Sequence, residues 1–288
     1  MERPFLERED ETAVLGRWLE DVGRSGAGAL VLVAGEAGVG KTTLVRRFCE
    51  SRGDARVLWG VCDPLATPAP LGPVVEVAAQ LGASAADVVA GAARPYEVGR
   101  ALLDDLARER SAVVVLEDLH WADEGTVDVL IHLARRIDRV PALVIGTYRD
   151  EGLDPRHRLR SALGLLATAP RVERLQVKPL SRAAVRVLAD AARRDGDAVF
   201  AATSGNPFFV SELLASAPGE VPATVRDAVL ARAAQLDEEA RELLDLVSVV
   251  RPQAELRLLE TVPGTEIGAL DRCVAAGVLE RQGGAIAF

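Results

Sequence analysis

The sequence has few aromatic residues, few cysteines and almost no lysine. Phe, Trp and Tyr together make up 4% of the 288 residues, so we expect hydrophobic cores built from Ala, Val and Leu. The three cysteines, Cys49, Cys62 and Cys273, are odd in number and widely spaced, which argues against a disulfide framework or a metal site. Only Lys41 and Lys178 are lysines among 34 basic residues. A lysine kept in such a sequence is expected where a compact ammonium is needed.

Long apolar runs and an excess of basic charge are also missing. The longest apolar stretches, such as Ala29–Ala34, are far too short to span a bilayer, and the charged N-terminus does not resemble a secretion signal. The 43 acidic residues give a formal net charge of −9. That balance argues against a stand-alone nucleic-acid binder and against a basic membrane-surface protein. We therefore expect a cytoplasmic protein without a membrane partner.

Short apolar runs alternate with helical patterns over residues 1–178. A polar loop, 5–10, and an amphipathic helix come first. Five buried strands are then predicted, at Ala29–Ala34, Ala55–Gly60, Ser111–Asp118, Ala142–Tyr148 and Val172–Val177. Helices are predicted between them, at Lys41–Arg52, Gly72–Leu81, Pro95–Glu109 and Asp123–Ile137. This alternation predicts a three-layer α/β domain with a parallel sheet.

Helical patterns dominate the remainder of the chain. They are predicted from Ser181, over Phe208–Ala215, twice within Val225–Val250, over Glu255–Glu260 and over Ile267–Ala276. The last residues resemble a β-hairpin with a Gly283-Gly284 turn. Prolines within Ala217–Thr224 mark a boundary. We therefore expect a small helical lid domain over 179–219 and a winged-helix domain over 220–288, in a chain that is a fragment of a longer protein.

A phosphate-binding motif follows the first predicted strand. The sequence GEAGVGKTT, Gly35–Thr43, matches G-x-x-x-x-G-K-[ST] between a strand and a helix, as the chemistry requires, although such a turn can match by chance. Glycines let backbone N–H groups approach phosphate oxygens, and the helix adds its positive end. Lys41 would bridge the β- and γ-phosphates, and the Thr42 hydroxyl would hold Mg²⁺. The predicted ATP or ADP contacts are Gly35, Gly38, Val39, Gly40, Lys41, Thr42 and Thr43.

Two carboxylates and an arginine are predicted to complete the site. Glu117 and Asp118 end an apolar strand, where the first acidic residue normally reaches the Mg²⁺ and the second orients or activates water. Here Glu117 takes the metal position and Asp118 the water position, an order that departs from the usual Asp-first pattern; a solvated strand end is the alternative. Arg149 ends another strand and is expected to sense the γ-phosphate, with a plain surface arginine as the alternative.

Together these segments resemble the nucleotide-binding module of STAND ATPases, a signalling branch of the AAA+-related P-loop proteins. In particular they are similar to the N-terminal region of large ATP-binding LuxR-type transcriptional regulators. The similarity covers nearly the whole chain through the segments FLERED, VCDPLATPAPLGPVVE, LEDLHWADEGTVDVL, GTYRDE and TSGNPFFVSELL. In the first of these Arg8 and Glu9 match the family, but Glu7 replaces its glycine.

The resemblance implies further roles. Arg8 joins the nucleotide contacts, and Pro207, in a Gly-x-Pro motif that begins at Gly205, contacts the adenine; the plainer reading of this motif is a helix-start turn. Slow ATP hydrolysis would set a switch that self-associates on activation. DNA would be bound only through a C-terminal domain absent from this chain. Residues 220–288 carry seven arginines and twelve carboxylates. This segment is therefore too acidic to be a DNA-binding domain.

Two other functions remain open from the residues alone. An AAA+ motor or replication initiator would use a trans-acting arginine, for which Arg156, Arg158 and Arg160 are candidates, and a sensor arginine in the lid, such as Arg182, Arg186 or Arg193. A P-loop kinase would need a substrate-acceptor motif, and none is recognisable. His120 and Trp121 follow the second carboxylate strand and could couple the site to the next helix, but packing is the plainer interpretation, and both are left out of the predicted catalytic set.

Overall fold

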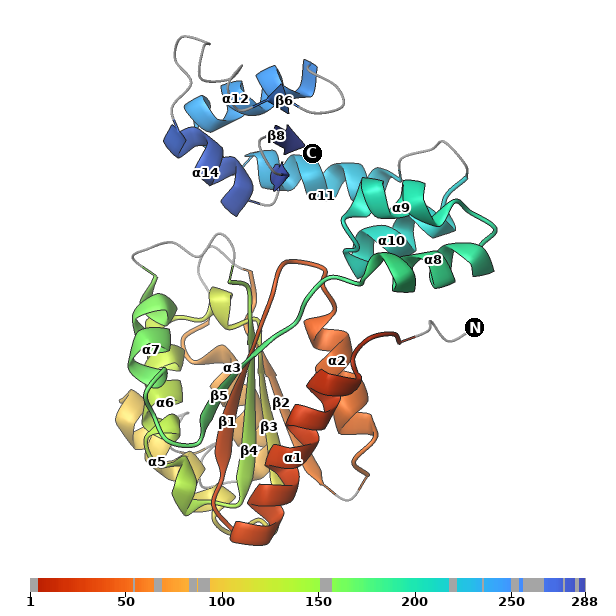
Figure 1. Ribbon diagram of the computed structural model, residues 1–288. Coiled ribbons are helices and arrows are strands. Elements are labelled where there is room, and N and C mark those ends of the chain that lie inside the picture. Colours follow the sequence, from red (N-terminus) through yellow and green to blue (C-terminus); the bar gives the residue numbers. More distant parts are fainter. Residues whose placement is uncertain are drawn as a thin grey trace. The chain divides into compact units, whose positions relative to one another are not determined.

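The computed structural model describes residues 5–53, 55–64, 69–82, 87, 94–150, 157–217, 222–234, 236–249, 254–255, 267–276, 278–282 and 285–287. The chain divides into two compact units, Met1–Pro179 and Leu180–Phe288 (Figure 1). Within the described part of the chain, no helix combines the length and apolarity that crossing a membrane requires.

A five-stranded parallel sheet forms the centre of the first unit. Its strands are β1 (Ala29–Ala34), β2 (Arg56–Val61), β3 (Ala112–Glu117), β4 (Ala142–Tyr148) and β5 (Val172–Gln176), in the order β2-β3-β4-β1-β5. All its pairings are parallel. In this order β4 lies between β1, which precedes the glycine-rich loop, and β3, which ends at the acidic pair. The carboxyl ends of these strands therefore meet at one edge of the sheet.

Helices cover both faces of this sheet (Figure 1). They are α1 (Glu9–Ser25), α2 (Lys41–Glu50), α3 (Gly72–Leu81), α5 (Pro95–Leu106), α6 (Glu124–Ala134) and α7 (Arg158–Leu166), with short 3-10 turns η1 (Leu119–Trp121) and η2 (Ile137–Arg139). The start of α6 is fixed by Asp123, whose carboxylate accepts hydrogen bonds from the backbone N–H groups of Gly125 and Thr126 at 3.1 and 3.3 Å.

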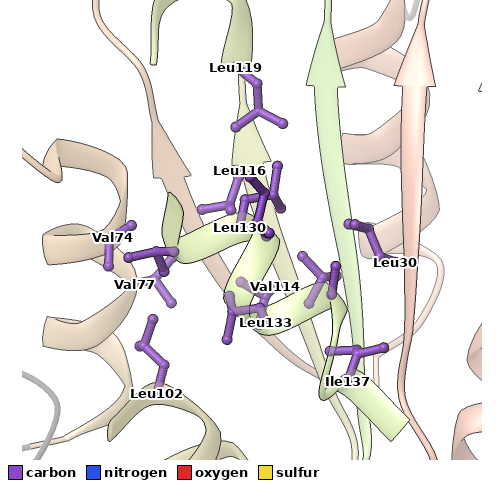
Figure 2. Packing of buried hydrophobic residues seen from close by; sticks show 14 of the residues in the cluster. Leu30, Val74, Val77, Leu102, Val114, Leu116, Leu119, Leu130, Leu133 and Ile137 are labelled. Atoms are coloured by element: carbon purple, nitrogen blue, oxygen red, sulfur yellow. The ribbon is translucent and has the colours of Figure 1, made fainter. Parts of the chain in front are cut away.

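The strands alternate their side chains between two hydrophobic cores. In β3, Val114 and Leu116 join the core formed with α3, α5, α6 and α7, which Figure 2 shows around Leu130 of α6. Val113 and Val115 point to the opposite core, formed with α1 and α2. Because successive side chains of a strand point to opposite faces, residue 117 at the end of β3 belongs to the face that α2 covers.

The second unit is built from short helices and a small antiparallel sheet. Its elements are α8 (Arg182–Ala191), α9 (Gly196–Thr203), α10 (Pro207–Ala215), α11 (Ala223–Ala234), α12 (Glu238–Val249), β6 (Ala254–Glu255), α14 (Ile267–Ala275), β7 (Glu280–Gln282) and β8 (Ala285–Ala287). The sheet has the order β6-β8-β7. Residues of α12 and α14 share a hydrophobic cluster with Ile286 of β8.

The predicted α/β class with a parallel sheet is confirmed for the first unit. The helices α7 and α9 were not predicted from the sequence, and α1 begins at Glu9, within the stretch predicted as a polar loop. It placed Glu255 in a helix, whereas this residue lies in β6, which pairs with β8. The Gly283-Gly284 turn and most of Glu255–Glu260 lie outside the described residues. The lid and winged-helix assignments stay predictions.

Candidate nucleotide-binding site

The glycine-rich loop turns sharply from β1 into α2. Gly35, Gly38 and Gly40 have φ angles of 152°, 81° and 97°. Residues that carry a Cβ rarely adopt such angles. Gly35 is also tightly enclosed, because a Cβ there would lie 2.7 Å from the carbonyl oxygen of Val177. Gly40 precedes the first residue of α2, and no described side chain caps this helix start. The loop therefore presents an uncapped helix N-terminus, the usual backbone setting for a phosphate group.

Lys41 is buried within this loop. Its ammonium Nζ donates hydrogen bonds of 2.8 Å to the carbonyl oxygens of Gly35 and Glu36, and the residue is 7% exposed. Burial lowers the pKa of Lys41 from 10.5 to about 8, and the positive charge of Arg149 acts in the same direction, against Asp118. The loop thus holds a desolvated cation beside the start of α2, where a phosphate group would gain most from it.

Arg8 ties the glycine-rich loop to the end of the sheet. Its guanidinium donates to the carbonyl oxygens of Lys178 at 2.8 Å and Val39 at 3.3 Å, and the residue is 5% exposed. The same side chain lies 3.7 Å from the carboxylate of Glu11. Arg8 therefore fixes the backbone of the loop within the first unit; its predicted contact with a nucleotide stays a prediction.

Glu117 lies at the end of β3 and is 5% exposed. Its Oε2 accepts a hydrogen bond of 3.0 Å from the indole Nε1 of Trp59, on the neighbouring strand β2. Its Oε1 is buried and has no hydrogen-bond partner among the described residues. A carboxylate oxygen in that state fits a Mg²⁺ ion or its water shell, and Thr42, in the first turn of α2, is the hydroxyl expected to share that ion.

Asp118 turns away from the strand direction, with φ 57° and ψ 44°. Its backbone N–H donates to Thr147 Oγ1 at 2.9 Å, and Thr147 is fully buried in β4. Burial raises the pKa of Asp118, and the charge of Glu117 raises it further, while Arg149 and Lys41 lower it. The left-handed backbone and the threonine anchor thus hold Asp118 within electrostatic range of both cations.

Arg149 follows β4 directly and is half-buried. Its charge acts on Lys41, on Asp118 and on His120, which places it among the charged groups at the carboxyl edge of the sheet. The structure therefore brings Lys41, Asp118 and Arg149 together, as the sequence predicted from the order of the strands. The role of each in binding or hydrolysis stays a prediction.

Two residues of this edge lie outside the predicted set of site residues. Trp59 donates a hydrogen bond to Glu117. Its place on the same face of β2 as Val57 could have indicated that it points toward this side of the sheet. His120 was interpreted as a packing residue, yet its Nδ1 lies 3.8 Å from Asp118 Oδ1. Its signal was its place two residues after Asp118, in a turn that the strand end positions.

Pro207 lies in the second unit, at the first position of α10. Asn206 caps this helix by accepting a hydrogen bond of 3.1 Å from the backbone N–H of Phe208. Gly205 has φ 78°, and its carbonyl oxygen accepts from the backbone N–H of Leu180 at 2.9 Å. This geometry is that of a capped helix start with proline in the first turn. The predicted adenine contact of Pro207 stays a prediction.

The fold and the loop define the first unit as a P-loop nucleotide-binding domain. Residues 4–145 match the family model of the AAA ATPase domain. The domain is therefore a P-loop ATPase domain of the AAA type, a class whose members bind nucleotide and generally use Mg²⁺.

Known structures share this fold across almost the whole chain. The Walker-type ATPase paby2304 of Pyrococcus abyssi aligns with 99% of this chain and 93% of its own, with a TM-score of 0.64 and 15% identity. The Aeropyrum pernix ORC1 protein, solved in complex with DNA, aligns with 98% of this chain and 88% of its own, with a TM-score of 0.53 and 16% identity. At such identities the similarity concerns the fold alone.

A curated relative is similar in sequence. An uncharacterized protein of Rhizobium meliloti is 30% identical over 209 residues, which cover 56% of this chain and 20% of the relative. The chain thus spans about a fifth of the length of the curated relative it matches.

Proposed function

We propose that this chain is the ATP-binding, slowly hydrolysing switch module of a STAND-type transcriptional regulator. The observation that carries the proposal is the Lys41 ammonium, held between two loop carbonyls and within electrostatic range of Asp118 and Arg149. The arrangement supports a site that receives a triphosphate at the start of α2 and a water molecule near Asp118. The regulator class rests on the sequence resemblance described above.

Each group has a separate task in binding. Backbone N–H groups of the loop from Gly35 to Thr43 surround the phosphates, and Lys41 neutralises the β- and γ-phosphate oxygens. Arg149 contacts the γ-phosphate and is therefore the residue whose surroundings differ between ATP and ADP. Arg8 keeps the loop in place, because it donates to the carbonyl oxygen of Val39. In the second unit, Pro207 is assigned to the adenine by resemblance alone.

Thr42 and Glu117 are the residues that would hold Mg²⁺. The unpartnered Oε1 of Glu117 supports this assignment, since a buried carboxylate oxygen without a donor is costly unless a cation or an ordered water reaches it. Bound there, Mg²⁺ would neutralise charge on the phosphate oxygens. Trp59 keeps the carboxylate in one orientation and leaves its other oxygen available.

Asp118 orients the attacking water and accepts its proton. Its raised pKa makes it a better proton acceptor than an exposed aspartate, and Thr147 fixes the backbone that carries it. The proton moves to an Asp118 oxygen as the water oxygen attacks the γ-phosphorus, and the bond to the β,γ-bridging oxygen breaks. ADP and phosphate result. Glu117 in the metal position, a longer side chain than the usual aspartate, fits slow turnover.

The remaining assignments extend beyond the first unit. We assign 1–178 to the ATPase domain, 179–219 to a helical lid and 220–288 to a winged-helix domain that packs against protein. We further infer a cytoplasmic switch that self-associates on activation and reaches DNA only through a domain outside this chain. Because the chain spans 20% of its curated relative, the activity of the whole protein belongs to this proposal too.

The rate of ATP turnover tests the switch directly. We expect hydrolysis of about 10⁻² s⁻¹ or slower, independent of protein concentration while the protein is monomeric, as in nucleotide switches that lack a partner. A motor or initiator that completes its site with an arginine from a neighbouring copy would instead show fast turnover that rises steeply with protein concentration. Phosphate release measured over a hundredfold range of protein concentration separates the two. Fast, concentration-dependent turnover contradicts the switch.

A further inference from the structure

His120 is an unusual buried residue beside the proposed site. Its side chain is 7% exposed, and neither ring nitrogen has a hydrogen-bond partner within the described part of the chain. Leaving a buried donor or acceptor unpaired costs free energy, so nearly all such groups in proteins are paired. An apolar side chain would fill this space without that cost. Packing alone therefore does not explain why a histidine occupies this position.

The position of His120 is set by the same turn that sets Asp118. Asp118 precedes the 3-10 turn η1, and its carbonyl oxygen accepts a hydrogen bond of 2.8 Å from the backbone N–H of Trp121. Leu119, inside the turn, is fully buried in the core shown in Figure 2. The His120 ring also packs against the Trp121 ring, with 5.2 Å between their centroids. Backbone and packing thus keep the imidazole next to the Asp118 carboxylate.

The imidazole is neutral at physiological pH. Burial, together with the charges of Arg149, Lys41 and His157, lowers the pKa of His120 from 6.5 to about 3. A neutral imidazole carries one N–H donor and one acceptor nitrogen. The neighbour best suited to that donor is the Asp118 carboxylate, whose Oδ1 lies 3.8 Å from Nδ1, so the two groups would have to approach further to form a hydrogen bond.

We propose that His120 is a positioning residue for hydrolysis, which donates its Nδ1–H to the Asp118 carboxylate and holds it in the orientation that aligns the attacking water. The proposal rests on the proposed function, because it needs Asp118 to act on water. His120 neither contacts the nucleotide nor exchanges a proton with it. Its loss should therefore lower the rate of hydrolysis and leave nucleotide affinity almost unchanged.

Two substitutions separate this role from packing. His120→Leu keeps an apolar body and removes the donor, whereas His120→Asn places an amide N–H close to the position of Nδ1. We expect His120→Leu to lower kcat by about 10- to 100-fold, as misplaced catalytic groups do, with KM and ATP affinity within about threefold of the wild type. His120→Asn should restore much of kcat. Wild-type kcat in His120→Leu, or equal losses in both variants, overturns the proposal.

Coupling to Asp118 gives a second measure. In a double-mutant cycle, His120→Leu should have no further effect on kcat once Asp118 is replaced by Asn, because the positioned carboxylate is already gone. If His120→Leu lowers kcat by the same factor in the Asp118→Asn background as in the wild type, the proposal is overturned. Melting temperatures of all variants show whether each remains folded, and we expect His120→Leu to be at least as stable as the wild type because it removes the unpaired polar atoms.

The tautomer can be observed without measuring activity. The chain has three histidines, so ¹⁵N NMR of the imidazoles can be assigned with single substitutions of His132 and His157. With a non-hydrolysable ATP analogue bound, the proposal requires a neutral His120 protonated on Nδ1. A neutral ring protonated on Nε2 overturns it. If the wild type binds no ATP, the proposed function itself fails; if it binds and hydrolyses ATP but His120→Leu does so equally well, only the present inference fails.

Discussion

The indole Nε1 of Trp59 donates a hydrogen bond of 3.0 Å to Glu117 Oε2 and thereby joins the edge strand β2 to the carboxylate at the end of β3. The Arg46 guanidinium of α2 lies over the Trp59 ring, 5.8 Å from its centroid. One oxygen of Glu117 is thus held by the fold, and the other lacks a partner among the described residues. We assign the unpartnered oxygen, Oε1, to Mg²⁺ because the other oxygen is already hydrogen-bonded.

Trp59→Phe should therefore weaken the response to Mg²⁺. The substitution keeps an aromatic ring but removes a hydrogen bond to a charged group, worth about 1.5–3 kcal/mol. We expect the Mg²⁺ concentration for half-maximal hydrolysis to rise about tenfold, with metal-free nucleotide binding little changed. Trp18→Phe is the matched control, because Trp18 also donates to a glutamate, Glu173, but between α1 and β5. The same Mg²⁺ dependence in both variants would contradict the assignment.

Asp118→Asn should separate binding from hydrolysis. Asp118 has a left-handed backbone, φ 57°, which Asn adopts nearly as easily, so the variant should fold normally. Removing its charge takes away the proton acceptor but no predicted phosphate contact. We expect ATP affinity within about threefold of the wild type and hydrolysis reduced at least 100-fold, the lower range for loss of a general base. Single-turnover phosphate release gives the rate, and unaltered hydrolysis removes Asp118 from its role.

Gly60→Ala should destabilise the first unit. A Cβ at Gly60 would lie 2.1 Å from the carbonyl oxygen of Pro73, so β2 and α3 would have to separate. We expect the free energy of unfolding to fall by about 2 kcal/mol or more, as for other overpacked sites. Gly164→Ala, in α7 with nothing within 4 Å of the added Cβ, is the control and should stabilise by up to about 1 kcal/mol. Urea denaturation measures both, and equal effects would show that the contact is not tight.

The buried cysteines of the first unit should react slowly with thiol reagents. Burial raises the pKa of Cys62 to about 12 and that of Cys49 to about 11, so at pH 8 almost no thiolate is present at either. Labelling should follow unfolding, and bound Mg·ATP should slow it further because a ligand of the folded state stabilises that state. The time course of labelling, with and without nucleotide, checks this. Labelling at the rate of a free cysteine in the folded protein would contradict the burial described here.

The sheet and the phosphate loop could be predicted from the sequence because each rests on a strong local pattern. The run from Ala142 to Tyr148 is mostly apolar on both faces, as is typical of a strand buried between two helical layers. The loop is defined by glycines at fixed spacing before Lys41, and its geometry follows from their φ angles. Parallel order then placed Glu117, Asp118 and Arg149 at one edge of the sheet.

Other features depend on contacts that local patterns do not contain. The helix α7 was missed although Leu159, Ala162 and Leu166 form an apolar stripe, because Gly164 and two arginines weaken its pattern. The hydrogen bond from Trp59 to Glu117 joins residues 58 positions apart, and the burial of His120 depends on packing around η1. No local pattern specifies either of them.

Calorimetric titration of Mg·ATP into the purified chain tests the central claim most directly. We expect one site per chain and, for Lys41→Ala, a loss of binding free energy of about 2 kcal/mol or more, close to a 30-fold weaker affinity, because a buried charge-assisted contact with phosphate is removed. Lys178 is the only other lysine of the chain and is exposed, so the Lys178→Ala variant should bind ATP like the wild type. Equal ATP affinity in wild type and Lys41→Ala, or no binding by the wild type, would contradict the proposed nucleotide site.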